Sequence, residues 1–253
     1  MSEKLLFNID VFIVVRKFFI YQNDSIFFKS IYLMPLKSIP FKVLSLPIGN
    51  YKIKIAQIEN PEFLFDDFLN KKPEDEDFKD EQIPYWADLW PSAIALSEFL
   101  VDNSKLVKDK SVLEIGCGLG LVGIVAAKLG GLVTLTDYLP AALEFAEYNW
   151  KLNFKTKADV QLLDWRKPQN ILPVDVLLAS DIAYESRSFK PLLKALKVLV
   201  KKDGLILIGE PNRKFAKEFF TDIKNEGYFI SDEARTVFKD GLKNKITIYL
   251  LKK

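Results

Sequence analysis

The 253-residue chain contains no histidine and a single cysteine, Cys117, and its 36 Lys and Arg nearly balance its 34 Asp and Glu. Without histidine, the chain lacks the commonest general base and the commonest metal ligand, which argues against a Ser-His-Asp hydrolase and against a metal site. A lone cysteine forms no intramolecular disulfide, so we expect a reducing, cytoplasmic setting. The net charge of +2 is not the strong positive charge typical of nucleic-acid-binding proteins, so no nucleic-acid partner is expected.

Long apolar runs are also missing. Residues 5–21 are rich in Phe, Ile and Val, but Asp10, Arg16 and Lys17 interrupt them well short of the roughly 20 apolar residues that a membrane span requires. No small-residue cleavage signal follows this stretch. We therefore expect a protein without a membrane segment, and we expect it to be a monomer.

The sequence divides into an N-terminal extension, residues 1–82, and a core domain, residues 83–253. Within the extension, residues 41–55 contain two short strand-like runs around a turn, which predicts a β-hairpin with one wet face. Residues 62–69 are typical of a short amphipathic helix. The acidic run 74–77 indicates a solvated linker, because such charge runs are usually solvated.

Strand-like and helix-like stretches alternate through the core domain, which predicts an α/β fold with a doubly wound, Rossmann-like sheet of seven strands and helices on both faces. The last two strands, near 229–238 and 245–251, should pair antiparallel, so the sheet is mostly parallel with an antiparallel C-terminal strand. A turn at Asp203-Gly204 is expected between a helix over 189–201 and a strand over 205–209. Ligands of such sheets bind outside the carboxyl ends of the strands.

The most informative stretch is residues 112–120, Val-Leu-Glu-Ile-Gly-Cys-Gly-Leu-Gly, which precedes a helix-like run over 121–129. Strand, glycine loop and helix in this order predict a nucleotide-binding turn, where the backbone bends sharply and approaches a ligand. Residues 118–123 also match the dinucleotide pattern G-x-G-x-x-G, but that match is weak by itself. Glu114 would oppose a pyrophosphate and could serve an amino group, while Asp137 is placed to accept hydrogen bonds from ribose hydroxyls. These two carboxylates favour S-adenosylmethionine over NAD.

Polar side chains recur where the predicted strands end. These segments are Glu114-Ile115-Gly116, Asp137, Asp164-Trp165 and Ser180-Asp181. The carboxyl ends of parallel strands share one edge of a sheet, so we expect these side chains to converge there. Upstream, Trp86 and Trp90 lie beside two prolines; they either pack in the core or cover the methionine end of the cofactor.

With these residues placed, the chain from about residue 84 onward resembles the class I, seven-strand methyltransferases. It looks most like the branch of protein-lysine methyltransferases that act on chaperones, on the valosin-containing ATPase and on the electron-transfer flavoprotein β-subunit. The segments that carry the resemblance are Leu89-Trp90-Pro91, residues 112–127, Thr136-Asp137, Asp164-Trp165 and Asp181-Ile182-Ala183-Tyr184. The last of these matches the D-x-x-Y signature associated with the active site of that branch.

The resemblance implies that residues 116–118 lie against the methionine moiety, that Asp137 holds the ribose and that Trp165 contacts the adenine. It also implies that Trp90 and Ser180 complete the pocket. Taken with the residue analysis above, the expected cofactor-contacting positions are Trp90, Glu114, Gly116, Cys117, Gly118, Gly120, Asp137, Asp164, Trp165 and Ser180. The expected catalytic residues are Asp181 and Tyr184.

The predicted function is methyl transfer from S-adenosylmethionine to a lysine side chain of a protein. Such a lysine must react as the neutral amine, which costs roughly 4 to 5 kcal/mol at pH 7 from a reference pKa near 10.4. We expect Asp181 to orient the amine and Tyr184, Trp86 and Trp90 to form apolar walls; helix capping is the structural alternative for Asp181. A small-molecule N-methyltransferase, an NAD-dependent oxidoreductase and a non-catalytic binding module remain open as other functions.

Overall fold

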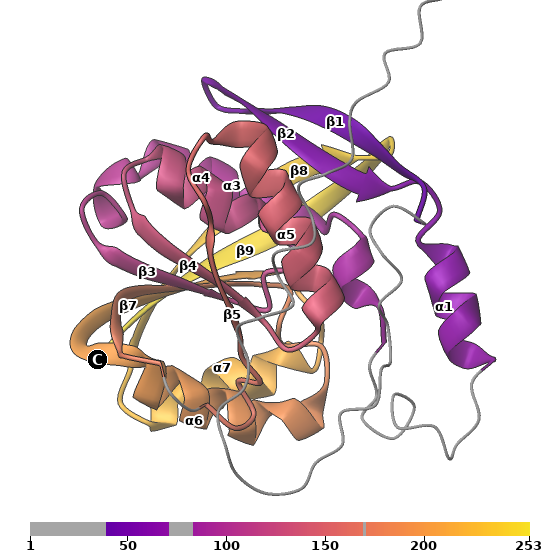
Figure 1. Cartoon of the computed structure of the whole chain (residues 1–253). Coiled ribbons are helices and arrows are strands. Elements are labelled where there is room, and N and C mark those ends of the chain that lie inside the picture. The colour runs from indigo at the N-terminus through magenta and orange to yellow at the C-terminus, as the bar shows by residue number, and fades with distance from the viewer. Residues whose placement is uncertain (1–38, 71–82, 169–170) are drawn as a thin grey trace, which may run out of the picture. The chain divides into compact units, whose positions relative to one another are not determined.

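The computed structural model describes residues 39–70, 83–168 and 171–253 (Figure 1). The expectations for residues 5–21 and for the acidic run 74–77 fall outside the described residues. In the part of the chain that is described, no helix has the length and apolar character needed to cross a membrane.

Seven strands form one sheet in the order β5-β4-β3-β6-β7-β9-β8. They are β3 (Ser111–Ile115), β4 (Leu132–Asp137), β5 (Asp159–Leu162), β6 (Val174–Ser180), β7 (Val200–Glu210), β8 (Phe229–Lys239) and β9 (Leu242–Lys252). Neighbours from β5 to β7 pair parallel, and β9 runs antiparallel to both β7 and β8. The predicted seven-stranded sheet with an antiparallel C-terminal strand is therefore confirmed.

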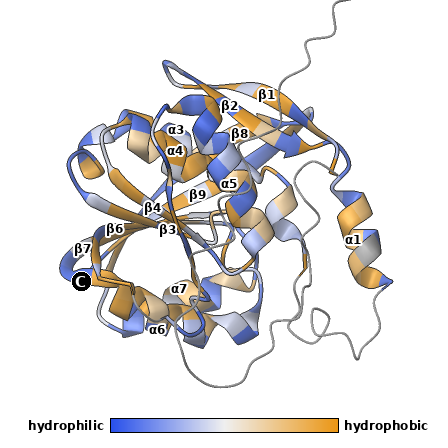
Figure 2. Ribbon diagram, viewed as in Figure 1, coloured by the Kyte–Doolittle hydropathy of each residue, from blue (hydrophilic) through white to orange (hydrophobic). Residues whose placement is uncertain are grey.

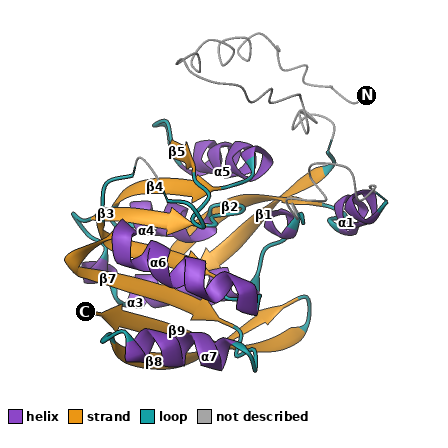
Figure 3. Ribbon diagram, turned by 90° about the horizontal axis from the view of Figure 1, so that it is seen from below, coloured by secondary structure: helices purple, strands orange, loops and turns teal. Residues whose placement is uncertain are grey.

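Helices cover both faces of this sheet (Figures 1 and 3). The helices are α3 (Pro91–Asp102), α4 (Leu121–Lys128), α5 (Pro140–Asn153), α6 (Phe189–Leu199) and α7 (Ala216–Asn225). One hydrophobic core contains residues of α3, α4 and α5, and a second core contains residues of α6 and α7. The central strands that separate these cores are mostly apolar in Figure 2, as expected for strands buried on both faces.

Strand β3 shows how the two cores divide the sheet. Val112 belongs to the core beneath α3, α4 and α5, whereas Leu113 and Ile115 belong to the core beneath α6 and α7. Successive side chains of a strand point to opposite faces, so Glu114 lies on the same face as Val112, under α4. This alternation decides where the Glu114 carboxyl group goes.

The predicted N-terminal hairpin is present as β1 (Phe41–Ile48) and β2 (Tyr51–Ile58), which pair antiparallel in a separate two-stranded sheet. The helix α1 (Glu62–Leu69) follows it, as predicted. On β2, Ile53 and Ile55 are fully buried and share the hydrophobic core of α3, α4 and α5. The hairpin is thus packed onto the core.

The predicted turn at Asp203-Gly204 is wrong. Helix α6 ends at Leu199 and β7 begins at Val200, so Asp203 and Gly204 both lie inside β7. The pairing of β6 with β7 shifts from Val174–Val200 to Val176–Leu205, so the residues between them form a bulge. A Cβ atom on Gly204 would lie 3.0 Å from the carbonyl oxygens of both Asp175 and Lys201. The glycine therefore serves close packing of the bulge.

Candidate active site

A recess opens where β3, β4 and β6 end, at the edge of the sheet that the sequence predicts. Nine of the residues that sequence analysis selects line it, namely Trp90, Gly116, Cys117, Gly118, Asp137, Trp165, Ser180, Asp181 and Tyr184. The 3-10 turn η3 (Tyr85–Ala87) adds Tyr85 and Trp86. Residues from positions 83 to 184 are thus brought together on one rim.

The glycine loop after β3 has the backbone that only glycine adopts easily. Gly116, Gly118 and Gly120 have φ angles of 61°, 50° and 79°, all in the left-handed region. The amide of Cys117 donates to the Thr136 carbonyl at 2.9 Å, which ties the loop to β4. A Cβ on Gly116 would meet only Ile182 Cδ1, at 3.6 Å, so the space beside this glycine is open.

Asp137 ends β4 and turns its carboxylate toward the loop. Its Oδ2 accepts a hydrogen bond from the Gly118 amide at 3.0 Å, and its Oδ1 accepts one from the Leu139 amide at 3.1 Å. Burial raises the pKa of this carboxyl group to about 6, and the backbone amides oppose the increase. Asp137 is therefore mainly ionised at neutral pH, and it attracts hydroxyl donors or a cation into the recess.

Three predicted cofactor-contacting residues lie away from this recess. Glu114 is 1% exposed, and its Oε2 accepts a hydrogen bond from the Gly123 amide in α4 at 2.8 Å, in contrast to the expected contact with an amino group. Burial raises its pKa to about 8, so Glu114 is largely protonated at neutral pH. Gly120 is the N-cap residue of α4, and a Cβ there would lie 3.1 Å from the Ala146 Cβ. Asp164 lines a neighbouring groove and accepts a hydrogen bond from Arg166 Nε at 2.8 Å.

Aromatic side chains wall the recess on the side of η3. The rings of Tyr85 and Tyr184 lie 5.3 Å apart, and Trp86 packs on Phe145 at 5.3 Å. The Trp90 Nε1 donates to the Tyr85 carbonyl at 2.7 Å, which fixes the orientation of its indole. Burial raises the pKa of Tyr184 to about 12. Tyr184 is therefore a neutral wall or hydrogen-bond donor and does not act as a phenolate base.

Cys117 presents a thiol and not a thiolate to the recess. Its side chain is buried, and burial raises the thiol pKa well above its usual range, with the carboxyl groups of Asp137 and Glu114 acting in the same direction. A nucleophilic cysteine needs the opposite shift. Cys117 is consistent with the expected small residue facing a ligand.

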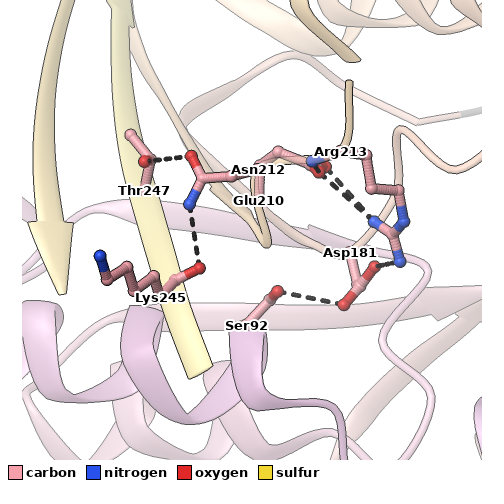
Figure 4. A network of polar contacts seen from close by, with 7 residues as sticks. All are labelled: Ser92, Asp181, Glu210, Asn212, Arg213, Lys245 and Thr247. Atoms are coloured by element: carbon pink, nitrogen blue, oxygen red, sulfur yellow. Dashed lines mark hydrogen bonds and ion pairs between the residues drawn. The ribbon is translucent and has the colours of Figure 1, made fainter. Parts of the chain in front are cut away.

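Asp181 is held by groups from three other parts of the chain, and Figure 4 shows the two that contact its carboxylate, Ser92 and Arg213. It follows β6 with a φ of 59°, and its amide donates to the Gly209 carbonyl at 2.9 Å. Its Oδ2 accepts a hydrogen bond from Ser92 Oγ at 3.0 Å, and its Oδ1 forms an ion pair with Arg213 Nη2. The next helical turn begins at Ser186, so Asp181 does not cap a helix.

Arg213 is itself fixed by the end of β7. Its amide donates to Glu210 Oε1 at 3.0 Å, and its Nη1 lies 3.5 Å from Glu210 Oε2. Burial raises the Glu210 pKa to about 7, although Arg213 opposes the increase. Asn212, which lies between Glu210 and Arg213 in the sequence, donates to the Lys245 carbonyl at 2.9 Å and accepts from Thr247 Oγ1 at 2.7 Å. These two hydrogen bonds anchor the loop to β9.

Ser92, Glu210 and Arg213 are not among the site residues predicted from the sequence. A signal for Glu210 was available, because it ends a parallel strand next to β6 and the rule that selects Asp137 and Ser180 applies to it equally. No comparable signal exists for Ser92, which enters the site from the first turn of α3.

Comparison with known proteins finds relatives of similar sequence. A family model described as lysine methyltransferase matches residues 78–226. The histone-arginine methyltransferase METTL23 of Xenopus laevis is 32% identical over 148 residues, which cover 54% of this chain and 63% of that protein. The protein-lysine methyltransferase METTL21E of Bos taurus is 41% identical over 135 residues, covering 49% of this chain and 46% of that protein. Against these two relatives, the match spans about half to two thirds of their length.

Solved structures share the fold. The crystal structure of magnesium protoporphyrin IX methyltransferase from Synechocystis with bound S-adenosylmethionine aligns with a TM-score of 0.51 at 15% identity. The alignment covers 78% of this chain and 98% of that one. At this identity, the likeness concerns the arrangement of the strands and helices.

Proposed function

The chain belongs to the lysine methyltransferase family, and from this premise we propose that it transfers a methyl group from S-adenosylmethionine to a lysine side chain of a protein. The observation that carries the proposal is the chemistry of the recess at the ends of β3, β4 and β6. Asp88, Asp137 and Asp181 line it, and none of the described residues that line it is a lysine or an arginine. Asp88 pairs with Lys239 and Asp181 with Arg213, so Asp137 is the main source of negative charge in the recess. Such a recess suits a cationic ligand and repels a pyrophosphate.

The residues of the recess fit the parts of S-adenosylmethionine. The open, Cβ-free backbone at Gly116 has room for the methionine moiety, and Asp137 can accept hydrogen bonds from ribose hydroxyls. Trp165 is buried and lines both the recess and the neighbouring groove, where an adenine ring would stack. Trp90 and Ser180 lie on the same rim. The Synechocystis methyltransferase, which shares the fold, was crystallised with S-adenosylmethionine bound.

S-adenosylmethionine supplies an already activated methyl group on a positively charged sulfur, so the protein has to align an acceptor and exclude water. Tyr85, Trp86 and Tyr184 provide the apolar wall that excludes water. Asp181 can accept a further hydrogen bond from the acceptor amine, because each carboxylate oxygen has two lone pairs. The nitrogen gains a bond to carbon and a positive charge, and it then loses a proton to solvent.

Calorimetry with two ligands tests the cofactor. S-adenosylhomocysteine should bind the purified protein, and NAD should produce no heat of binding. Binding of NAD alone would overturn the proposal and would favour an oxidoreductase. The lone Cys117 supports a reducing, cytoplasmic setting for the protein.

Transfer of a radiolabelled methyl group to a cell extract tests the acceptor. Acid hydrolysis of the labelled protein fraction should release methylated lysine. Methylated arginine is the second candidate, because one relative is named a histone-arginine methyltransferase. Label found only in small molecules would contradict a protein acceptor.

A further inference from the structure

We infer that Arg213 is a positioning residue that balances the charge of Asp181, so that the acceptor amine meets a neutral ion pair and not an isolated carboxylate. The inference rests on the proposed function, since it concerns the group that approaches the transferred methyl. It assigns a role to a residue outside the D-x-x-Y segment.

The geometry places Arg213 behind Asp181. Asp181 lines the recess, whereas Arg213 is not among the residues that line it. Figure 4 shows Ser92 and Arg213 reaching the carboxylate from different sides, each at its own oxygen. The Asp181 side chain is 7% exposed and that of Arg213 24% exposed, so water screens this pair only in part.

The loop between β7 and α7 keeps Arg213 in place. The Arg213 amide donates to Glu210 Oε1. The neighbouring Asn212 has a φ of 65° and forms hydrogen bonds with both Lys245 and Thr247. A non-glycine residue in the left-handed region is costly unless its surroundings fix it. The same loop geometry therefore directs the guanidinium toward Asp181.

The surrounding titratable groups leave this pair close to neutral. Glu210, at the end of β7, has a pKa of about 7 and carries only part of a negative charge near neutral pH. Tyr184 after β6 and Tyr249 on β9 have raised pKa values and are neutral. The other carboxylates of the recess are Asp88, which pairs with Lys239 at 3.3 Å, and Asp137 at the end of β4, on the proposed ribose side.

A neutral pair solves a problem that a lone carboxylate would create. A carboxylate favours the ammonium form of a nearby amine, whereas a guanidinium beside it opposes that form. Methyl transfer uses the lone pair of the nitrogen, which forms a bond to the methyl carbon as the carbon–sulfur bond breaks and its electron pair stays on sulfur. An amine with a proton in place of that lone pair cannot react. An arginine suits this role because it remains charged at any pH that the protein experiences.

Two probes report this charge balance without knowledge of the acceptor. S-adenosylhomocysteine has an uncharged sulfur, and sinefungin has an ammonium group near the position of the transferred methyl. The ratio of their dissociation constants, from calorimetry at about pH 7.5, isolates the electrostatic preference for an amine cation. In Arg213→Gln we expect the affinity for sinefungin to rise about tenfold relative to the affinity for S-adenosylhomocysteine. A variant that merely distorts the site would weaken both.

Matched variants make the result decisive. Arg213→Lys retains the charge and should keep the wild-type ratio to within about threefold, as should Lys214→Gln, which removes a neighbouring exposed charge. Asp181→Asn leaves the charge of Arg213 opposed only by the partly ionised Glu210 and should shift the ratio about tenfold against sinefungin. The double variant Asp181→Asn with Arg213→Gln should restore the wild-type ratio.

An unchanged ratio in both Arg213→Gln and Asp181→Asn would overturn this inference. If Arg213→Gln does not fold, as judged by circular dichroism, Asp181→Asn alone decides, and an unchanged ratio there rejects the inference. Failure of the wild-type protein to bind S-adenosylhomocysteine would instead reject the proposed function. The two failures are therefore distinguishable.

Discussion

The side chain of Asn149 on α5 pairs with the backbone of Ala56 on β2 as a neighbouring strand would. Its Oδ1 accepts from the Ala56 amide at 2.6 Å, and its Nδ2 lies 3.3 Å from the Ala56 carbonyl oxygen. The same Nδ2 also donates to the Leu119 carbonyl in the glycine loop at 2.9 Å. One amide group therefore joins the N-terminal hairpin to the loop that borders the recess.

The next turn of α5 repeats the contact. Asn153 Oδ1 accepts from the Lys54 amide at 3.0 Å, and its Nδ2 donates to the Lys54 carbonyl at 2.7 Å. Residues 54 and 56 share one edge of β2, and residues four apart share one face of a helix. Two asparagines thus cover part of the open edge of the hairpin.

Replacement of Asn149 by alanine should reduce both stability and cofactor affinity. The change leaves a buried amide at Ala56 and a buried carbonyl at Leu119 without this partner, and each such group costs about 1 to 3 kcal/mol. We expect the free energy of unfolding in urea to fall by about 2 kcal/mol or more. Affinity for S-adenosylhomocysteine should fall as well, because the loop loses its support.

Asn153→Ala is the matched control. It removes the same type of contact with β2, but this contact is exposed and does not reach the glycine loop. A loss of about 1 kcal/mol without a change in affinity is expected. If Asn149→Ala binds S-adenosylhomocysteine as tightly as Asn153→Ala does, the hairpin does not support the loop.

Ionisation of Asp137 should control cofactor binding. Its pKa of about 6 lies close to neutral pH, and the protonated carboxyl group loses its charge and part of its capacity to accept hydrogen bonds. Affinity for S-adenosylmethionine should be constant above pH 7 and should fall below pH 6, approaching about tenfold per pH unit. Asp137→Ala should bind weakly at every pH. A wild-type affinity that stays flat down to pH 5 would contradict this role.

Much of the fold and part of the site follow from local sequence signals. The ends of β3, β4 and β6 are predictable because apolar runs stop there at glycine, aspartate or serine. The place of Glu114 next to the glycine loop suggests contact with a ligand, whereas strand alternation turns its side chain under α4. Val112 faces one hydrophobic core and Leu113 and Ile115 face the other, which is the same alternation.

Other features depend on tertiary contacts that a single sequence does not reveal. Asn149 and Ala56 are 93 residues apart, and an asparagine on a helix has no preference for a distant strand. At Asp203-Gly204, the local signal for a turn corresponds to a bulge inside β7, between the residues that pair with Val174 and Val176 of β6. Arg213 reaches Asp181 only because a loop held by β9 directs it there.

Glu114→Gln should make the protein more stable at pH 8. The folded pKa of Glu114 is about 8, against an ordinary value of 4.5. A carboxyl group with a raised folded pKa contributes stability that is fully present below pH 4.5 and is lost as the pH rises toward 8. Glutamine can still accept from the Gly123 amide and does not titrate.

Urea unfolding between pH 5 and pH 9 measures this effect. The wild-type free energy of unfolding should decline across this range, and the variant should show a smaller decline, with a gain on the order of 1 kcal/mol or more at pH 8. The partly exposed Glu147 offers a control, and Glu147→Gln should retain the wild-type pH dependence. Equal slopes in Glu114→Gln and the wild type would show that Glu114 is ionised in the folded protein.

Asp181→Ala should separate catalysis from cofactor binding. The carboxylate stands on the rim of the recess, and the glycine loop and Asp137 remain intact without it. Affinity for S-adenosylhomocysteine should therefore be nearly unchanged, while the rate of methyl transfer into extract protein should fall at least about tenfold, equivalent to about 1.4 kcal/mol. Asp137→Ala should show the reverse order, with binding lost first. A wild-type transfer rate in Asp181→Ala would remove Asp181 from the mechanism and leave its ion pair with Arg213 a purely structural contact.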